Sequence, residues 1–515
     1  MIQETRTPSL LQAFIPILFL VGLLALNVAV YSDDASYGPN QIALILAAGI
    51  ATIISVRLGF KWSTVLAGIV KSISSAMPAL LILLIIGSLS GTWLISGIVP
   101  AMIYYGLEVL NPTIFLFAAC IVSAVVSIAT GSSWTTAATI GIALIGIGNA
   151  LGISEAVTAG AVISGAYFGD KMSPLSDTTN LAPAMAGTDL FTHIKYMAYT
   201  TVPSIVITLV IFFIWGFTLD ASSSVESVSV VQDAIASKFN ITPWLFLVPL
   251  AVVVMIIKKV PAIPALLGGA LLGGVFALIF QPDIVREIVG DGGVGIEGDG
   301  GILSWFFDAD MVKSIKLGLK KFADPYQGVL TSIFTEVSVQ TGNETVDKLL
   351  TSKGMNGMLN TVWLILCAMI FGGVMEVTGM LKRMAQAIIS YANSTGSLVA
   401  STAATCVVFN VTASDQYIAI VVPGRMFAST YRERGLAPEN LSRTLEDSGT
   451  VTSVLIPWNT CGAYQSGVLG VGTFAYLPYC FFNIISPFMT ILFAYLNIKI
   501  RKLGKVQERD VIETV

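Results

Sequence analysis

Charged residues are scarce in this sequence. Only 11% of its 515 residues are Asp, Glu, Lys or Arg, whereas soluble domains carry about 25%. Hydrophobic residues make up 55% of the chain, and the mean hydropathy is +0.82. So few charges cannot cover a soluble globule of this size, and so many apolar residues exclude a disordered chain. The composition therefore predicts a polytopic membrane protein.

Histidine, cysteine and basic charge are also in short supply. One histidine excludes a multi-histidine metal site, and five cysteines in apolar stretches without C-x-x-C spacing indicate small core residues. The net charge of −4 argues against a nucleic-acid partner. The sequence shows no nucleophile–base pair and no G-x-x-x-x-G-K-[ST] phosphate loop, which disfavours an enzyme and an ATP-driven pump. We expect no cofactor.

Long apolar runs, by contrast, are abundant. A spanning helix needs about 20 mostly apolar residues, and the candidate segments are 10–31, 41–56, 76–98, 112–130, 135–151, 157–186, 198–219, 243–257, 262–281, 357–378, 395–411, 416–430, 440–469 and 474–498. Polar residues and prolines interrupt 157–186 and 440–469, and some segments are candidates for re-entrant hairpins. The sequence thus predicts an all-α polytopic membrane protein with about 10–14 membrane segments.

The two halves of the chain match each other at a nearly constant offset. Matched pairs lie 282 or 283 residues apart: Pro174 with Pro457, Gly152 with Gly435, Ser132 with Asp415, Gly97 with Gly379 and Gly91 with Gly373. A register held to one residue over such a distance is not expected by chance. The chain is predicted to be a duplicated unit.

Basic residues indicate that the two copies are inverted. Loops 99–111 and 146–156 carry no Lys or Arg, whereas their second-half counterparts carry Lys382 and Arg383, and Arg432 and Arg434. Basic loops stay in the cytoplasm, so equivalent loops should lie on opposite sides of the membrane. Inversion requires an odd number of crossings in each half, and seven plus seven satisfies this.

The expected organisation follows from the repeat. We expect a first inverted repeat over 1–219, a linker over 220–242, a second inverted repeat over 243–498 with a polar insertion at 283–343, and a cytoplasmic tail over 499–515. Both termini should be cytoplasmic. The acidic Gly-rich run 290–301 lacks the full pattern of a calcium loop, and we interpret it as a flexible external loop.

Each half contains a polar break within an apolar segment. The run 169–180, GDKMSPLSDTTN, cannot be one continuous helix, because Pro174 removes a donor and clashes one turn back. Irregular backbone at membrane depth survives only where protein or a water-filled cavity surrounds it. Freed carbonyls beside two carboxylates, hydroxyls and an amide would suit Na⁺; the alternative is an ordinary loop in water.

The second break, 450–463, contains no carboxylate, and the charge in its half comes instead from Asp415 and from Glu446 and Asp447 upstream of the break. Asp415 lies at a polar tip, 410–416, whose first-half counterpart is 131–136. Two tips and two breaks, paired by the duplication, should converge near the membrane midplane. The predicted sodium-binding residues are Asp170, Asp177, Thr178, Asn180, Ser132, Ser133, Asp415, Asn459 and Thr460. The alternative role for Asp415 is to cap the helix that follows it.

Other polar residues in apolar surroundings have two interpretations each. Glu376 is either a proton carrier or an interfacial residue. Glu446 lies three residues after Arg443 and could pair with it. Lys171 either neutralises a buried acid or is displaced by a bound cation. His193 is either a pH sensor or an ordinary interfacial residue.

Three motifs resemble the NhaC family of sodium/proton antiporters. They are GDKMSPLSDTTNLA, ASDQYIAIVVPGRMF and RTLEDSGTVTSVLIPWNTCGA, and the resemblance extends over about residues 10–498. It implies cation-coupled antiport in a bacterial or archaeal cytoplasmic (inner) membrane. The family also includes exchangers of organic anions, such as malate for lactate, and members linked to amino-acid uptake.

Inverted repeats with interrupted helices are typical of secondary transporters. The leading hypothesis is a Na⁺/H⁺ antiporter that works by alternating access, in which Na⁺ and protons compete for buried carboxylates. The main alternative is a Na⁺/H⁺-coupled organic-anion or amino-acid exchanger, although neither break contains the Arg that favours carboxylate substrates. A passive channel has less support, because no filter motif is repeated. The expected partners are Na⁺, H⁺, the lipid bilayer, a small organic substrate in the alternative, and a second copy of the chain in a homodimer.

Overall fold

The computed structural model describes residues 6–31, 35, 37–109, 111–219, 224–289 and 323–503. Across these ranges the chain is almost entirely helical. Its two named strands, β1 (Val337–Ser338) and β2 (Thr351–Ser352), form one short antiparallel pair. The all-α prediction is confirmed, while the acidic run 290–301 lies outside the described residues.

Eight of the described helices are long and apolar enough to cross a membrane. They are α1 (Leu10–Tyr31), α2 (Pro39–Arg57), α3 (Trp62–Ile95), α5 (Pro112–Thr130), α10 (Leu190–Gly216), α13 (Ala262–Phe280), α18 (Leu359–Val377, together with α17, Gly354–Gly357) and α20 (Thr395–Thr412). Two helix pairs, bent by 90° and 57° at short breaks, raise the count to ten if each pair is one span. This matches the lower end of the predicted 10–14 segments.

Shorter helices make up the rest of the described chain. Their bounds are α4 (Ile98–Val109), α6 (Ser133–Thr136), η2 (Ala137–Gly141), α7 (Ile142–Ala150), α8 (Glu155–Met172), α9 (Asp177–Ala186), α11 (Ser224–Lys238), η3 (Pro243–Phe246), α12 (Leu247–Ile257), α14 (Pro282–Val289), residues 323–334, α16 (Glu344–Leu349), α19 (Met380–Ile389), α21 (Gln416–Glu433), α22 (Pro438–Leu445), η5 (Glu446–Thr450), η6 (Ser453–Leu455), α23 (Thr460–Leu469), α24 (Thr473–Tyr476), η7 (Leu477–Tyr479) and α25 (Phe481–Tyr495). The expected loop 99–111 is therefore largely the helix α4. The chain turns at Gly97, whose φ of 79° lies in the left-handed region that glycine adopts readily, and it then continues as α4.

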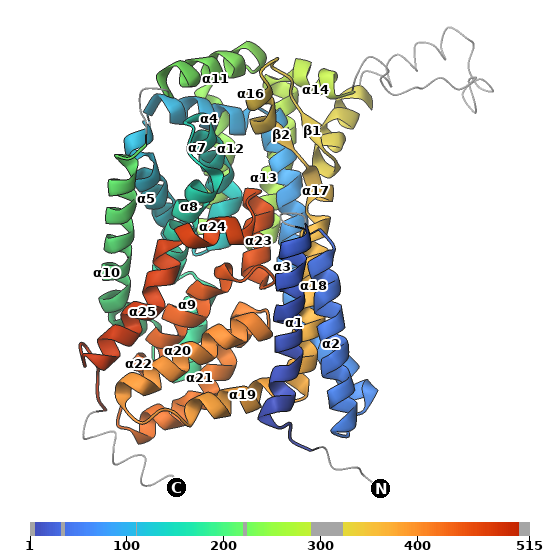
Figure 1. Ribbon diagram of the computed structural model, residues 1–515. Helices are drawn as coiled ribbons and strands as arrows, with labels where there is room; N and C mark the ends of the chain where they lie inside the picture. The colour runs from blue at the N-terminus through green and yellow to red at the C-terminus, as the bar shows by residue number, and fades with distance from the viewer. Residues whose placement is uncertain are drawn as a thin grey trace, which may run out of the picture.

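Long helices form the outer walls of the molecule. In Figure 1, α1, α2, α3 and α18 stand together on one side, and α10 runs along the opposite side. α18 packs on both α2 and α3, and α13 also packs on α3. Between the walls lie α20 and α21 together with the shorter helices α9, α22 and α23 (Figure 1). The polar breaks therefore lie among helices rather than on the outer surface.

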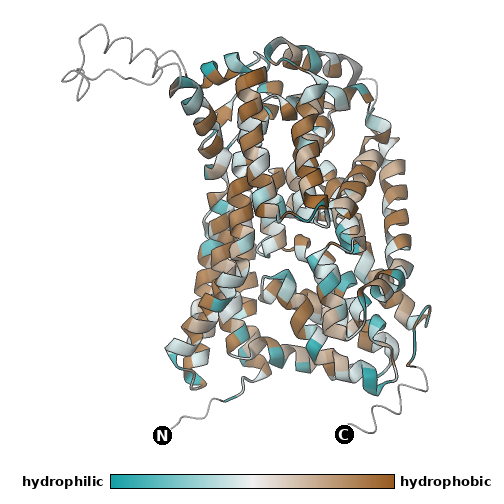
Figure 2. Ribbon diagram, turned by 180° about the vertical axis from the view of Figure 1, so that it is seen from behind, coloured by the Kyte–Doolittle hydropathy of each residue, from teal (hydrophilic) through white to brown (hydrophobic). Residues whose placement is uncertain are grey.

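The two ends of the molecule hold different helices. The start of α1 lies beside the end of α2, because Arg6 N–H donates to the Leu58 carbonyl (2.9 Å). The same end holds α19 and α22, whereas α4, α11 and α14 lie at the other end (Figure 1). Figure 2 shows apolar residues covering the long helices and polar ones gathering at both ends and in the middle. This distribution is typical of a protein that crosses a bilayer.

Helix ends recur at the offset predicted for the duplication. Left-handed residues that end helices pair up at 282 or 283 residues: Gly97 with Gly379, Gly131 with Ser414, Gly152 with Gly435, and Gly187 with Gly470. In Figure 1, α4, α5 and α7 lie in the upper half, and their sequence counterparts α19, α20 and α21 lie in the lower half. The inversion of the two copies stays a prediction that this arrangement favours.

Small residues allow α5 and α8 to pack closely. A Cβ on Gly165 would lie 2.0 Å from the Cys120 carbonyl oxygen, and one on Gly169 would lie 2.4 Å from that of Ala124. The Ser127 hydroxyl donates to the Ala166 carbonyl (2.6 Å) across the same contact. Close approach of small residues is how membrane helices associate. This contact fixes the C-terminal end of α8, which carries Asp170.

Candidate cation-binding site

The first tip and the first break meet at Asp170. This residue lies in the last turn of α8, is 7% exposed, and its Oδ2 accepts hydrogen bonds from the backbone N–H (3.1 Å) and the hydroxyl (2.6 Å) of Ser133. Ser133 is the first residue of α6, which Ser132 caps by accepting from Thr135 N–H (3.1 Å). A helix N-terminus favours a carboxylate. The structure thus brings together the predicted site residues Asp170 and Ser133, with Ser132 adjacent.

The chain between α8 and α9 is irregular, as Pro174 predicts. The Thr179 hydroxyl lies within hydrogen-bond distance of the carbonyl oxygens of Asp170 (3.2 Å) and Lys171 (3.0 Å). The Asn180 amide donates to the carbonyls of Pro174 (3.0 Å) and Ser176 (2.7 Å). Carbonyl oxygens at the end of a broken helix are groups that bind Na⁺ in secondary transporters.

The other predicted ligands of the first break are divided by exposure. Thr178 is buried, and its hydroxyl lies 3.2 Å from that of Ser176. Asp177 and Asn180 are exposed at the start of α9. Asp177 still interacts electrostatically with Asp170. Asp177 is therefore an exposed neighbour of the buried Asp170 carboxylate.

The second tip and the second break are also joined by hydrogen bonds. The Asn459 amide donates to the carbonyl and to Oδ1 of Asn410 (both 3.1 Å), and its own Oδ1 accepts from Cys461 N–H (3.0 Å) at the start of α23. Thr460 N–H donates to the Ser414 carbonyl (3.0 Å). Asn459 and Thr460 thus lie at the tip, as the duplication predicts, although hydrogen bonds within the protein occupy the Asn459 amide.

Asp415 is buried and caps α21. It is 3% exposed, and its Oδ1 accepts from Ile418 N–H (3.0 Å). The capping role weighed from the sequence is therefore present. Asp415 also interacts electrostatically with Glu376, which is partly buried on α18, and with Tyr417, which interacts with Asp170 and Asp177 as well. Tyr417 therefore lies near acids from both halves of the chain.

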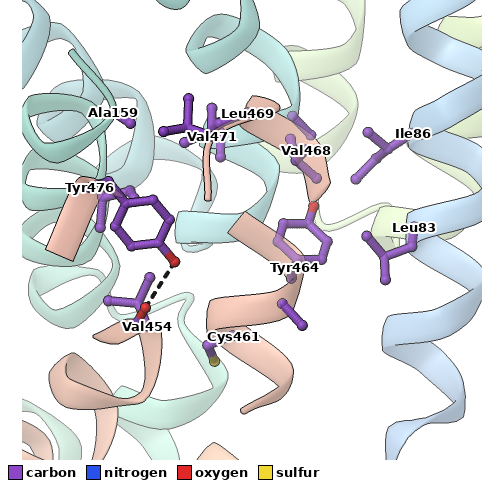
Figure 3. Close-up of a cluster of buried hydrophobic side chains, with 14 of the residues drawn as sticks. Leu83, Ile86, Ala159, Val454, Cys461, Tyr464, Val468, Leu469, Val471 and Tyr476 are labelled. Carbon is purple, nitrogen blue, oxygen red and sulfur yellow. Dashed lines mark hydrogen bonds between the residues drawn. The ribbon is translucent and has the colours of Figure 1, made fainter. Parts of the chain in front are cut away.

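Aromatic contacts connect the two halves beside the tips. The rings of Trp134 and Tyr464 are stacked with centroids 3.9 Å apart, and the Tyr464 hydroxyl donates to the Trp134 carbonyl (3.0 Å). Figure 3 shows Tyr464 of α23 facing Leu83 and Ile86 of α3. In the same view the Tyr476 hydroxyl donates to the Val454 carbonyl (2.9 Å) within the second break. The apolar core therefore fixes the second break in place.

A buried ion pair joins the halves below the first break. Lys171 Nζ pairs with Asp447 Oδ1, and neither side chain is exposed. Thr200 donates to Asp447 Oδ2 (2.8 Å) and Ser486 to Oδ1 (3.2 Å). The prediction that Lys171 neutralises a buried acid is confirmed, and the acid is Asp447. Breaking such a pair by removing one partner costs about 3–5 kcal/mol, because a buried charge is left alone.

Glu446 is a feature that the predicted ligand set omits. The sequence suggested a pair with Arg443, but this is wrong: the ion pairs of the described chain do not include one between them. Glu446 is fully buried, and neither carboxylate oxygen has a hydrogen-bond partner. Arg443 instead donates through Nη1 to the Lys499 carbonyl (3.3 Å) and lies 4.6 Å from the centre of the Tyr196 ring. The sequence signal was the acidic pair Glu446–Asp447 in an apolar segment.

His193 and the cysteines are all buried. His193 Nδ1 lies 2.8 Å from the Ser442 hydroxyl, which places it inside the helix packing rather than at an exposed interface. All five cysteines are free and buried. The prediction that they are small core residues is confirmed.

Comparison with known proteins gives a consistent result. Residues 165–294 and 314–498 match the family model described as the Na⁺/H⁺ antiporter family. The Na⁺/H⁺ antiporter NhaC of Alkalihalophilus pseudofirmus is 36% identical over 90% of this chain and 91% of its own length. The malate-2H⁺/Na⁺-lactate antiporter of Bacillus subtilis is 33% identical over 96% of both chains. The arginine/ornithine antiporter ArcD of Halobacterium salinarum is 33% identical over 96% of this chain and 93% of its own.

Proposed function

The chain belongs to the Na⁺/H⁺ antiporter family, and from this premise we propose that it exchanges Na⁺ for H⁺ by alternating access, as a carrier rather than an enzyme. It resides in the cytoplasmic membrane with both termini in the cytoplasm. Support for this orientation comes from basic residues at the end that holds α19 and α22, namely Arg57, Lys382, Arg383, Arg432 and Arg434.

The observation that carries the proposal is the junction of Asp170 with Ser133. A buried carboxylate, a hydroxyl and the carbonyls at the end of α8 lie where a helix is broken between apolar segments. Oxygen ligands of this kind suit a hard cation such as Na⁺. We assign the sodium site to Asp170, Ser133 and the α8 carbonyls, with Asp177, Thr178 and Asn180 at its edge. Ser132, Asp415, Asn459 and Thr460 would complete it from the tips and the second half.

Competition between Na⁺ and protons for buried carboxylates is sufficient to couple the Na⁺ flux to the proton flux. A carboxylate neutralised by either a proton or Na⁺ can cross the low-dielectric barrier, whereas the bare ion cannot do so cheaply. Each ion can therefore return only in exchange for the other. The two copies of the repeat would supply the two alternating conformations, one open to each side.

Reconstitution tests this function directly. Proteoliposomes loaded with a pH-sensitive dye should acidify or alkalinise when a Na⁺ gradient is imposed, and the direction should reverse with the gradient. Saturation with Na⁺ and counterflow of labelled Na⁺ would separate a carrier from a channel. Absence of any Na⁺-driven proton movement would contradict the proposal.

One observation favours the alternative of an organic-anion or amino-acid exchanger. Arg443 is fully buried, yet its Nε and Nη2 have no hydrogen-bond partner, and Arg is suited to binding carboxylates. Relatives of similar identity are named for malate, lactate, arginine and ornithine. Adding each of these compounds to the proteoliposome assay would decide, because an exchanger needs an organic substrate on at least one side for Na⁺-driven proton movement.

A further inference from the structure

Glu446 is buried among the packed helices, and its carboxylate oxygens have no hydrogen-bond partner. Its exposed fraction is 0%, and neither Oε1 nor Oε2 accepts a hydrogen bond, although the Thr450 hydroxyl lies beside it. An ionised carboxylate that is buried without a hydrogen-bond partner loses the full solvation free energy of its charge. A protonated carboxyl loses far less. The site therefore suits the neutral acid, or the ionised acid when a cation is near.

The backbone geometry at Glu446 differs from that of α22, the helix that precedes it. Residues Glu446–Thr450 form a single π-helical turn, η5, between α22 and the second break. Turns of this kind are rare and often occur at functional sites. All five residues of the turn are buried. The turn places Glu446 and Asp447 side by side inside the packed helices.

The charged groups around Glu446 come from α8 and from its own turn. Lys171 and Asp170 of α8 and Asp447 of η5 act on it electrostatically. Titratable or charged side chains on the other helices packed against η5 are Cys406 of α20; Tyr417, Arg425, Tyr431, Arg432 and Glu433 of α21; Glu439 and Arg443 of α22; Asp177 of α9; and Tyr495 of α25. α25 contributes the uncharged Ser486 and Asn483. Lys171 is already paired with Asp447, so Glu446 has no counter-ion of its own among the described residues.

We propose that Glu446 is a proton-binding residue of the transport cycle, distinct from the sodium ligand Asp170. This inference rests on the proposed Na⁺/H⁺ exchange. The step is the binding and release of one proton at the carboxylate oxygen. Asp447 keeps its ion pair with Lys171 in this step.

Electrostatics would couple this proton to the sodium site. Of the three charged groups that act on Glu446, Lys171 and Asp447 are paired with each other, which leaves the Asp170 carboxylate as the unpaired one. Binding Na⁺ beside Asp170 and protonating Glu446 each raise the charge of the cluster by one unit. Two uncompensated carboxylates near each other in a low dielectric disfavour joint ionisation. Na⁺ binding should therefore release the Glu446 proton, and protonation of Glu446 should weaken Na⁺ binding, by the same coupling free energy.

The decisive variant is Glu446→Gln, measured by two transport assays in proteoliposomes. Glutamine has the shape of the protonated acid and cannot release a proton. We expect Na⁺-driven proton movement to fall at least about tenfold, while counterflow of labelled Na⁺ against unlabelled Na⁺ stays within about twofold of wild type. The pH dependence of Na⁺ binding should also flatten.

Matched controls identify the cause of each result. Glu433→Gln makes the same chemical change at an exposed position at the end of α21 and should leave both assays unchanged. Glu446→Asp keeps the acid on a shorter arm, so it should retain proton coupling with a shifted pH profile. This variant also tests the proposal if the glutamine variant does not accumulate, because an unchanged pH profile for Glu446→Asp would overturn it.

Other outcomes contradict the proposal in distinct ways. Normal proton coupling with normal pH dependence in Glu446→Gln would show that Glu446 carries no proton in the cycle. Loss of Na⁺ counterflow along with proton movement, in a folded variant, would make Glu446 part of the sodium site. If wild type itself moves Na⁺ without protons, the proposed function fails before the variant is considered.

Discussion

At the scale of single residues, the proposed sodium site depends on the charge of Asp170. Replacement by Asn keeps the size and one hydrogen-bond acceptor for Ser133 but removes the charge. We expect Asp170→Asn to weaken the apparent Na⁺ affinity at least about tenfold, which corresponds to about 1.4 kcal/mol, or to abolish transport. The measurement is Na⁺-driven proton movement as a function of Na⁺ concentration.

A suitable control for Asp170→Asn is Asp189→Asn. Asp189 caps α10 from an exposed position, where hydrogen bonds from Thr192 hold the pKa of its carboxyl below the ordinary range. Asn can also cap a helix, so this variant should transport normally. Equal Na⁺ dependence in the two variants would remove Asp170 from the site.

Asp415 permits a separation of capping from charge. Because Asp415 Oδ1 accepts from Ile418 N–H and Asn caps equally well, Asp415→Asn should leave the thermal stability of the protein within about 0.5 kcal/mol of wild type. If the acid is shared between the halves, the same variant should uncouple or abolish exchange and reduce the pH dependence of Na⁺ binding. Thermal unfolding in detergent and the liposome assay give the two readouts. Normal transport would leave capping as its whole role.

At the scale of elements, the α5–α8 contact should control the site from a distance. A methyl group on Gly165 would meet the Cys120 carbonyl at 2.0 Å, and relieving that overlap would force the helices apart. We expect Gly165→Ala to destabilise the protein by about 1–3 kcal/mol and to weaken Na⁺ affinity by moving Asp170 away from Ser133. Thermal unfolding and Na⁺ titration measure both effects. Gly22→Ala on α1, where nothing lies within 4 Å of the added methyl, should change neither.

Elements and their interruptions could largely be predicted from the sequence, because they depend on local chemistry. Pro174 and Pro457 predicted both breaks, and apolar runs predicted the long helices. The helix α4 was missed, because its 12 residues are too few for a spanning helix and Pro100 and Gly106 interrupt its apolar run. Residues 57–75 lie between the predicted apolar runs 41–56 and 76–98, but α3 already begins at Trp62.

Side-chain partners were harder to predict, because they depend on packing between distant segments. The duplication indicated that tips and breaks would meet, which agrees with the Asp170–Ser133 and Thr460–Ser414 contacts. Nothing local indicated that Lys171 would pair with Asp447 rather than with its neighbour Asp170. The isolation of Glu446 likewise follows from the helices around it and not from its spacing to Arg443.

At the scale of the whole molecule, the two ends should face opposite sides of the membrane. Because all five native cysteines are buried, single cysteines placed at exposed positions give a clean readout. We expect Ser237→Cys on α11 to react with an impermeant thiol reagent added outside cells. Lys382→Cys on α19 should react only when the cytoplasmic face is accessible. The reverse pattern would invert the proposed orientation, and labelling of both from one side would contradict a transmembrane arrangement of these ends.

The Lys171–Asp447 pair also has a consequence for how the protein is made. The two residues are 276 positions apart, and a ribosome adding ~5–20 residues per second needs roughly 14–55 s to travel from one to the other. Throughout that interval Asp447 cannot neutralise the lysine, whose ammonium must stay in water or within the insertion machinery. The first half can therefore reach its final packing only once the second half has emerged, and we expect a nascent chain arrested before Asp447 to be a preferred substrate for membrane quality-control proteases.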